Sequence, residues 1–273
     1  LFDEGWITGS DEPFTRLFNQ GMVLRNSEKM SKSRGNVVGI DETAQTYGVD
    51  AMRLFLLAAT PPEDTMEWTD EGISGRVRFL QRAWRAGEPF LAQAKEIPVD
   101  QLPPLTDAPR KDLVRALHTV LDSGIFESSS RRFHFNTTVA RLDELVNLMT
   151  PASANPELKG DPAFLYCVRL LPVALAPFAP HIAEELWSRM GMSGSVHLQQ
   201  WPQPDPAALA VDSITLVVQV NGKIRAKIDA APGLDANAAY DLALADANVQ
   251  THLGGKTINR RFYVPDKLVS FVV

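Results

Sequence analysis

The hydrophobic pattern of the chain changes its period near residue 200, and this change excludes a fold made of a single structural class. Between about residue 70 and the proline-rich segment 199–212, apolar residues recur at helical spacing. After it, "TLVVQV" and "KIRAKI" alternate with a period of two around Asn221-Gly222, a pair typical of a two-residue hairpin turn. Segment 199–212 is therefore predicted to be a linker between a helical domain and a small α/β domain.

Four or five helices with proline-rich joints are predicted between residues 70 and 190, which favours a helical bundle. The first carries an apolar stripe of Ile73, Val77, Leu80 and Trp84. Further helices are predicted over 110–124, 134–149 and 162–190, the last of them broken near Pro177–Pro180. Beyond the linker, a helix over about 235–249 and strands over 257–264 and 267–273 complete the small domain.

Residues 1–68 are typical of the end of an α/β domain. A short apolar strand is predicted over 20–24, and Asp41 can cap a helix that stops at Gly48. Asp50 can cap a second helix, which ends before Pro61. The predicted domains are therefore 1–69, 70–205 and 206–273.

The composition excludes several classes of protein. A single cysteine among 273 residues, Cys167, excludes a disulfide framework and a cysteine-based zinc site, and it favours a reducing compartment. The five histidines have no metal-ligand spacing, so no metal site is predicted. The net charge of −6 means that any binding to nucleic acid must use local basic patches. Because the chain begins at Leu1 and reads like the middle of a domain, a fragment or a processed chain is expected.

The segment "EKMSKSRGN" (28–36) is the strongest candidate for a binding site. One interpretation is a solvated surface loop, which is usual for a short run of charges. The other is a loop that holds a strong anion. Ser31, Ser33 and Gly35 would let backbone N–H groups approach the anion, and Lys29, Lys32 and Arg34 would supply countercharge.

Two other groups of basic residues also allow two interpretations. Arg78, Arg82 and Arg85 form either a solvated helix face or a contact to ribose-phosphate. Lys223, Arg225 and Lys227 alternate with apolar residues, so all three are expected on one strand face. That face is either the wet side of a half-buried strand or a nucleic-acid contact. The second interpretation gains weight from Lys256, Arg260, Arg261 and Lys267, since residues 213–273 hold seven Lys/Arg against five Asp/Glu.

"KMSKS" (29–33), which follows a strand and precedes a helical bundle, resembles the second nucleotide motif of class I aminoacyl-tRNA synthetases. Other stretches resemble successive landmarks of the bacterial leucyl-tRNA synthetase family, in family order: "DEPFTRLFNQGMVL" (11–24), "YGVDAMRLFLLAATPPEDTMEW" (47–68), "FNTTVARLDELVN" (135–147), "APFAPHIAEELW" (176–187) and "VVQVNGKIRAKI" (217–228). The last stretch favours the leucine family over the valine and isoleucine families.

The resemblance implies a fold and an activity. The implied fold is the end of a Rossmann-like catalytic domain, a bundle of the anticodon-binding type and a small C-terminal α/β domain that binds tRNA. The implied activity is leucine–tRNA ligation: leucine is activated with ATP and Mg²⁺ and is then transferred to tRNA(Leu). The implied localisation is the cytoplasm, without a membrane.

The resemblance also implies roles for single residues. Lys32 is the expected main phosphate contact and Lys29 a second catalytic cation, while Arg34 stands where lysine is usual. The expected ATP contacts are Lys29, Met30, Ser31, Lys32 and Ser33. The expected tRNA contacts are Arg78, Arg82, Arg85, Lys223, Arg225, Lys227, Lys256, Arg260 and Arg261.

Two departures from the family limit what can be carried over. The family's HIGH motif, editing domain and leucine pocket are not found, and they are expected in an upstream portion of the same synthetase. The isolated chain is therefore expected to be inactive. Only residues 25–28 stand where many relatives carry an inserted domain before KMSKS. A rival interpretation is a non-catalytic subunit that binds tRNA or a partner chain, and the genomic sequence upstream would distinguish the two.

Overall fold

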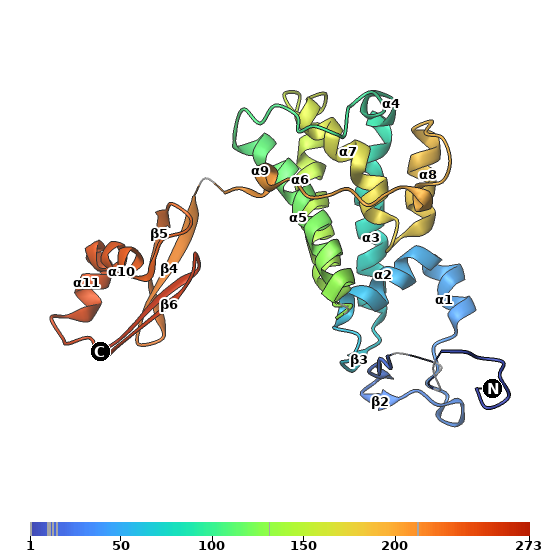
Figure 1. Cartoon of the computed structure of the whole chain (residues 1–273), viewed down its shortest axis with the longest axis horizontal. Coiled ribbons are helices and arrows are strands. Elements are labelled where there is room, and N and C mark those ends of the chain that lie inside the picture. Colours follow the sequence, from blue (N-terminus) through green and yellow to red (C-terminus); the bar gives the residue numbers. More distant parts are fainter. Residues whose placement is uncertain (1, 10–11, 13, 15, 131, 212) are drawn as a thin grey trace. The chain divides into compact units, whose positions relative to one another are not determined.

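The computed structural model of the protein describes residues 2–9, 12, 14, 16–130, 132–211 and 213–273. The described chain forms two compact units, residues 1–209 and 210–273 (Figure 1). It is a mixed α/β protein with one small sheet in each unit. None of the helices in the described ranges is long and apolar enough to span a membrane.

The first unit begins with a three-stranded sheet in the order β2-β1-β3, made of β1 (Val23–Arg25), β2 (Glu28–Lys29) and β3 (Met66–Glu67). Strand β1 is antiparallel to β2 and parallel to β3. Between β2 and β3 lie α1 (Ile40–Tyr47) and α2 (Val49–Ala59). The predicted caps differ, because Gly39 and Gly48 are the N-cap residues of α1 and α2, while Asp41 and Asp50 lie inside the first turns.

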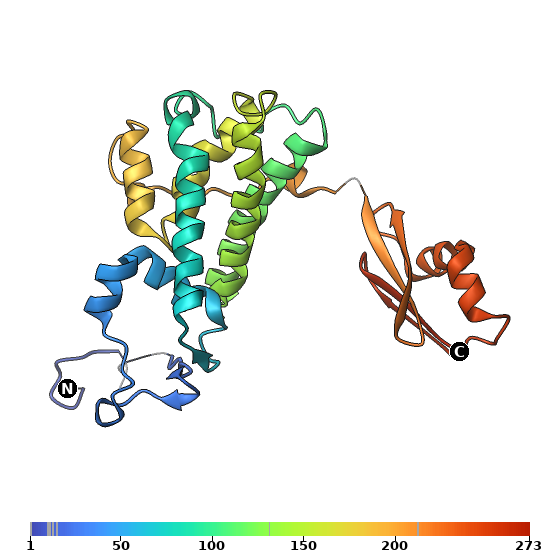
Figure 2. The same cartoon turned by 180° about the vertical axis from the view of Figure 1, so that it is seen from behind.

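The helical bundle occupies the rest of this unit (Figures 1 and 2). Its helices are α3 (Asp70–Gly87), α4 (Leu91–Ala94), α5 (Ala108–Ser130), α6 (Phe135–Ala154), α7 (Pro162–Leu175), α8 (Pro180–Arg189) and the short α9 (Pro206–Leu209). The predicted break near Pro177–Pro180 is confirmed. Helices α5 and α6 extend beyond the predicted 110–124 and 134–149, and in the added part of α6 Ala152 is buried in the main core.

Helix α3 buries more than the predicted single stripe. Ile73 is fully buried as expected, but Val77, Leu80 and Trp84 are only partly buried. Phe79 and Ala83 form a second, fully buried line within the main core. Because α3 packs against both α2 and α6, two sides of the helix are covered, which a stripe in a single sequence does not reveal.

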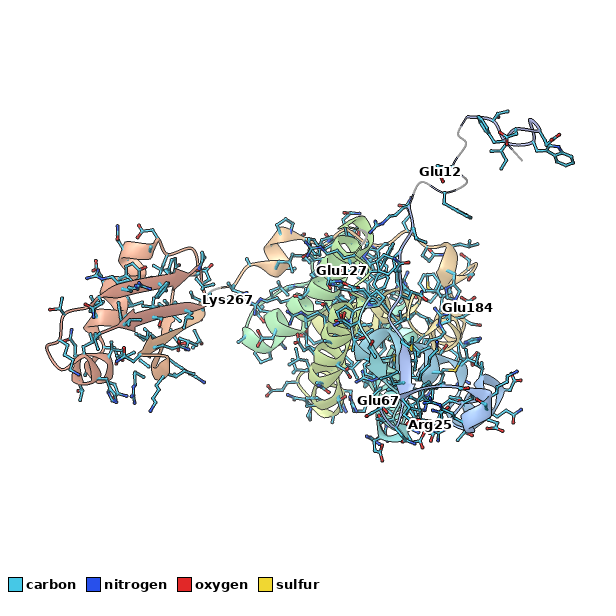
Figure 3. All side chains as sticks on the ribbon, turned by 90° about the horizontal axis from the view of Figure 1, so that it is seen from below. Glu12, Arg25, Glu67, Glu127, Glu184 and Lys267 are labelled. Carbon is cyan, nitrogen blue, oxygen red and sulfur yellow. The ribbon has the colours of Figure 1, made fainter. Side chains whose placement is uncertain are left out.

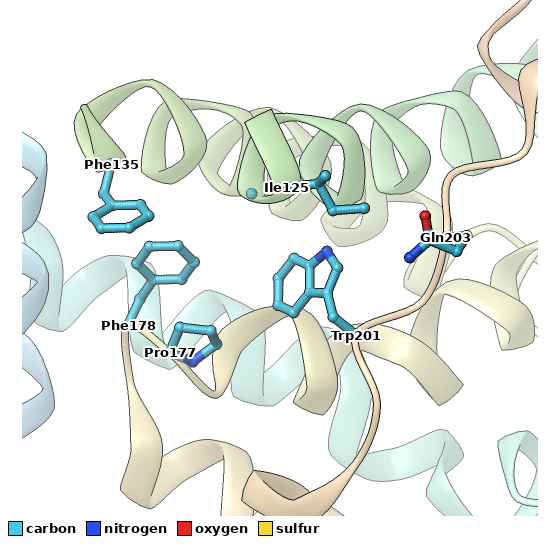
Figure 4. A pocket seen from close by; sticks show the side chains of 7 residues that line it. Ile125, Phe135, Pro177, Phe178, Trp201 and Gln203 are labelled. Atoms are coloured by element: carbon cyan, nitrogen blue, oxygen red, sulfur yellow. The ribbon is translucent and has the colours of Figure 1, made fainter. Parts of the chain in front are cut away.

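The predicted linker 199–212 is in large part packed on the bundle. The Trp201 indole donates a hydrogen bond to the backbone oxygen of Leu121 at 3.0 Å, and Ala208 is buried. A Cβ at Gly124 would come within 2.6 Å of the Trp201 ring, so only glycine allows this approach. The Trp201 ring lines an apolar hollow of about 510 Å³ (Figure 4). Asp212, the last residue of the predicted linker, lies outside the described residues.

The second unit is a four-stranded sheet in the order β5-β4-β7-β6, with helices on one side (Figures 1 and 2). Its elements are β4 (Ile214–Val220), β5 (Lys223–Ala230), α10 (Ala236–Ala245), α11 (Ala247–Leu253), β6 (Arg260–Val264) and β7 (Leu268–Val272). The predicted hairpin is confirmed, with positive φ at both Asn221 and Gly222. The single helix predicted over 235–249 is wrong, because Asp246 leaves helical geometry and caps α11 through its side chain.

Candidate functional site

A tight hairpin positions the basic loop (residues 28–36). Strands β1 and β2 pair Leu24 with Lys29 and Arg25 with Glu28, and the two turn residues, Asn26 and Ser27, both have positive φ. The backbone N–H of Ser27 donates to Oε1 of Glu67 at 3.0 Å, which ties the turn to β3. Arg25 and Glu67 mark this sheet in Figure 3. Residues 25–28 are thus a complete hairpin turn, which was not predicted from the sequence.

Asn36 closes the basic loop with both ends of its carboxamide. Its Oδ1 accepts from the backbone N–H of Ser31 at 2.8 Å, and its Nδ2 donates to the backbone oxygen of Lys29 at 3.2 Å. Gly35 precedes it with φ +67°, a left-handed conformation that favours glycine. Asn36 was not among the predicted site residues, although its place after this glycine is a usable turn signal.

The predicted backbone anion cradle is wrong for three of the loop's amides. The N–H of Ser31 is held by Asn36, that of Arg34 donates to the Ser31 oxygen at 3.1 Å, and that of Gly35 donates to the Lys32 oxygen at 3.3 Å. These amides form the 3₁₀ turn at Lys32–Arg34. An anion at this loop would therefore meet side-chain charges before it met these amides.

Two lysines carry the available charge of the basic loop. Lys29 and Lys32 are exposed, and within the described ranges neither ammonium group has an ion pair or a side-chain hydrogen bond. Arg34 differs, because its Nη1 pairs with Oε2 of Glu28 at 3.0 Å. Both partners of that pair are 59% exposed, so it contributes little stability but removes Arg34 from the free charges. The Oγ atoms of Ser31 and Ser33 lie 2.9 Å apart.

Met30 anchors the loop to a small apolar cluster. Its side chain packs against a buried cluster that includes Phe55 and Trp68, and Val23, Val38 and Met52 pack against the same cluster. The same region encloses a hollow of about 220 Å³. Met30 thus attaches the loop to the apolar cluster, while Lys29 and Lys32 are exposed to solvent.

The described residues contain no group of three or more His, Cys, Asp or Glu side chains that could hold a metal ion. A metal held by the protein alone therefore does not fit this part of the chain. Cys167 does not offer an alternative site, because it is fully buried and burial raises the pKa of its thiol.

The structure separates the three arginines of the predicted helix face. Arg78 and Arg85 are exposed on α3. Arg82 instead lies 3.6 Å from a carboxylate oxygen of Asp143 on α6, which also binds Arg76 at 2.6 Å. The prediction that Arg82 shares an exposed side of α3 with Arg78 and Arg85 is wrong, because packing of α3 on α6 brings its guanidinium group to Asp143.

A bulge in β5 also separates the three cations of the hairpin. Val220 pairs with Lys223 and Gln219 with Ile224, but Val218 pairs with Ala226, so Arg225 is the extra residue. Lys227 pairs with Val217. Because successive residues of β4 point to opposite faces, Lys223 and Lys227 lie on opposite sides of the sheet. The predicted single cationic face is therefore wrong.

The side of the second sheet away from α10 and α11 is here called the open face, and it is partly apolar. Phe262 and Val264 on β6 are 51% and 44% exposed, and Ile224 on β5 is 57% exposed. Cross-strand register places Lys227 and Arg260 on the same face. On the helix side, Arg261 instead lies over the Tyr240 ring at 5.6 Å.

Two protein-family descriptions match the chain. "tRNA synthetases class I (I, L, M and V)" matches residues 5–69, which contain the basic loop. "Anticodon-binding domain of tRNA ligase" matches residues 124–240, from within α5 to within α10.

Curated relatives match nearly the whole chain. A leucine–tRNA ligase of Geobacter sp. is 41% identical over 266 residues, which are 96% of this chain and 32% of that protein. A leucine–tRNA ligase of Petrotoga mobilis is 39% identical over 282 residues, covering all of this chain and 33% of that protein. The chain thus spans about a third of the length of these relatives.

A solved structure agrees with these relatives. It is the crystal structure of a ternary complex of the agnB2 LeuRS of Agrobacterium radiobacter with tRNA and LeuAMS. The match has a TM-score of 0.75 and 31% identity, and it covers 96% of this chain and 34% of that chain. By sequence and by fold, nearly the whole chain is similar to about one third of the length of leucine–tRNA ligases, and parts of it match the class I tRNA synthetases and the anticodon-binding domain of tRNA ligases.

Proposed function

We propose that the chain is the C-terminal portion of a leucine–tRNA ligase, in which it supplies the phosphate-binding loop and much of the tRNA-binding surface. The observation that carries the proposal is the basic loop, which keeps two lysines unpaired while Arg34 is paired with Glu28. The first unit would combine the end of the Rossmann-like catalytic domain with the anticodon-binding-type bundle. The second unit would be the small tRNA-binding domain.

In the proposed reaction, the carboxylate of leucine attacks the α-phosphate of ATP, and pyrophosphate leaves. Negative charge on the phosphates then grows, and Lys32 and Lys29 would stabilise it as mobile point charges. Met30 and Ser31 would lie near the nucleotide by backbone contact, with Ser33 beside them. Mg²⁺ would arrive bound to the phosphates of ATP, because these residues offer no cluster of ligands to hold it.

For tRNA, we propose that the open face makes the main contacts of the second unit. Lys227 and Arg260 can neutralise phosphates, and the exposed Phe262 ring can stack on an unpaired base. Lys223, Arg225, Lys256 and Arg261 in the second unit, and Arg78, Arg82 and Arg85 on α3, remain predicted secondary contacts. Arg82 and Arg225 are the weakest of these. Arg82 lies near Asp143, and the Nε of Arg225 is buried without a hydrogen-bond partner among the described residues.

The test is leucine-dependent exchange of pyrophosphate into ATP. The 273-residue chain alone is expected to give no exchange, and adding the remaining portion of a leucine–tRNA ligase is expected to produce it. Exchange by the chain alone would contradict the assignment of the leucine pocket to another portion. If the combined chains bind tRNA but give no exchange, the rival function, a non-catalytic tRNA-binding subunit, would replace this proposal.

A further inference from the structure

Two side chains of α2 hold the corner between α7 and α8. Asp50 is a carboxylate with only 7% of its surface exposed. It accepts from the backbone N–H of His181 at 3.3 Å and of Ile182 at 2.8 Å, and the Nδ1 of His181 lies 2.8 Å away. One turn further along α2, Nη2 of Arg53 donates to the backbone oxygen of Pro177 at 3.0 Å. Asp50 and Arg53 are here called the α2 clasp.

Asp50 caps the N-terminus of α8, a role that usually falls to the residue just before the helix. The first N–H groups of a helix have no partner within the helix, and Pro180, the first residue of α8, has no N–H. The N-cap residue is Ala179, which has no side-chain acceptor. The free N–H groups of His181 and Ile182 are therefore satisfied from another helix. A serine or aspartate at position 179 would satisfy these N–H groups from within the same segment. Because Asp50 on α2 does so instead, the cap also links α2 to α8.

The opposite side of α2 supports the basic loop. Met52 lies in the same apolar cluster as Met30, and the Phe55 ring meets the Trp68 ring edge-on at a centroid distance of 5.0 Å. Helix α2 is thus packed between the loop's anchor and the α7–α8 corner. Movement of α2 would move Ala51 and Phe55, which belong to the buried cluster against which Met30 packs. Leu54 packs in the main core, and the clasp fixes the first half of α2 to the α7–α8 corner.

We propose that Asp50 and Arg53 are positioning residues for the basic loop, because the clasp holds the loop's support at one place on the helical bundle. The functional part of this inference rests on the proposed function, since it assumes that the loop binds ATP. Neither side chain would touch the nucleotide. Their effect would pass through α2 and Met30 to Lys29 and Lys32.

The first experiment measures amide hydrogen exchange in the 273-residue chain and needs no catalysis. The reporters are the hydrogen-bonded amides of Ser31, Arg34 and Gly35. Asp50→Asn keeps the size of the side chain but removes its charge, and it is expected to speed exchange at these amides roughly five- to thirtyfold. Arg53→Met, a change at an exposed residue, is expected to give a smaller rise in the same amides.

The matched control is Asp161→Asn. Asp161 caps α7 through the N–H of Ala163 at 2.9 Å and binds Arg110 at 2.8 Å. It stands at the far end of α7, about 20 Å from the corner at the helical rise per residue. Asp161→Asn should weaken the same bundle but leave the hydrogen exchange of the loop amides unchanged. If the α8 amides open in Asp50→Asn while the loop amides stay as in the wild type, Asp50 is only a helix cap and the proposal fails. If Asp50→Asn does not fold, the test uses Arg53→Met, and unchanged hydrogen exchange at its loop amides would likewise contradict the proposal.

The second experiment uses a full-length leucine–tRNA ligase that carries this sequence as its corresponding third. Asp50→Asn is expected to lower kcat for pyrophosphate exchange by a similar factor of roughly five to thirty, with the KM for leucine unchanged. A rise in the KM for leucine at constant kcat would contradict a role through the loop. If the wild-type enzyme gives no exchange at all, the proposed function fails, while the hydrogen-exchange result still decides whether the clasp positions the loop.

Discussion

Asn36 determines what the basic loop can offer to a phosphate. Its carboxamide takes the Ser31 N–H and the Lys29 oxygen, and the turn uses the N–H groups of Arg34 and Gly35. The composition of the loop correctly indicated an accumulation of positive charge. It could not indicate which amides are already used, because that depends on how residues 29 and 36 meet in space.

His118 is a buried group whose protonation should weaken the first unit. Its Nδ1 accepts from the backbone N–H of Asp205 at 2.9 Å, and its Nε2 lies 3.2 Å from the Tyr166 hydroxyl. Burial lowers the pKa of His118 below its ordinary value of 6.5 and raises the pKa of Tyr166 to about 12. The neutral imidazole thus fastens residues 201–209 to α5.

Acid should therefore destabilise the first unit through His118. The unfolded chain takes up this proton near the ordinary pKa and the folded chain only at lower pH, so the stability is complete above about pH 6.5 and falls as the pH drops toward the folded pKa. His118→Gln removes this proton, so its urea midpoint should depend less on pH than that of the wild type between pH 7.5 and 5.5. His197→Gln, at an exposed site, is the control. Parallel pH profiles for wild type and His118→Gln would contradict the prediction.

For single elements, the sequence predicted correctly those features whose geometry is set by a few neighbouring residues. The Asn221-Gly222 turn and the helix break at Pro177–Pro180 were both predictable for this reason. The bulge at Arg225 and the pairing of Arg82 with Asp143 were not, because a strand's register and a helix's second packing partner depend on other elements. The role of Asp50 was missed similarly, since it caps α8 and not its own helix.

The separation of cations by the bulge gives a testable difference between the two sides of the second sheet. Lys227→Glu with Arg260→Glu changes the open face, and Lys223→Glu with Arg261→Glu changes the helix side by the same charge. The open-face pair should weaken tRNA binding more and should reduce the salt slope by about two units, close to one for each phosphate that is no longer neutralised. Binding titrations of the 273-residue chain at several salt concentrations measure both quantities. Equal effects of the two pairs would contradict a special role of the open face.

At the scale of the whole molecule, the two units are expected to divide the work between leucine activation and tRNA affinity. A full-length ligase that ends after Leu209 keeps the basic loop, the clasp and the packed segment 201–209. It should retain pyrophosphate exchange but bind tRNA more weakly and with a flatter salt dependence. Unchanged tRNA binding would remove the RNA role from the second unit. Loss of exchange would show that the first unit needs the second for its own structure.

The basic loop is proposed to stabilise charge on ATP during leucine activation, and the decisive measurement is the rate of leucyl-adenylate formation with Lys32→Ala. In a full-length ligase that carries this sequence, the substitution should slow adenylate formation about a hundred- to thousandfold, by analogy with the loss of one oxyanion donor. The KM for leucine should change little, and Lys159→Ala, at an exposed lysine before α7, should behave as the wild type. A Lys32→Ala enzyme that forms adenylate at the wild-type rate and shows only a raised KM for ATP would contradict the claim.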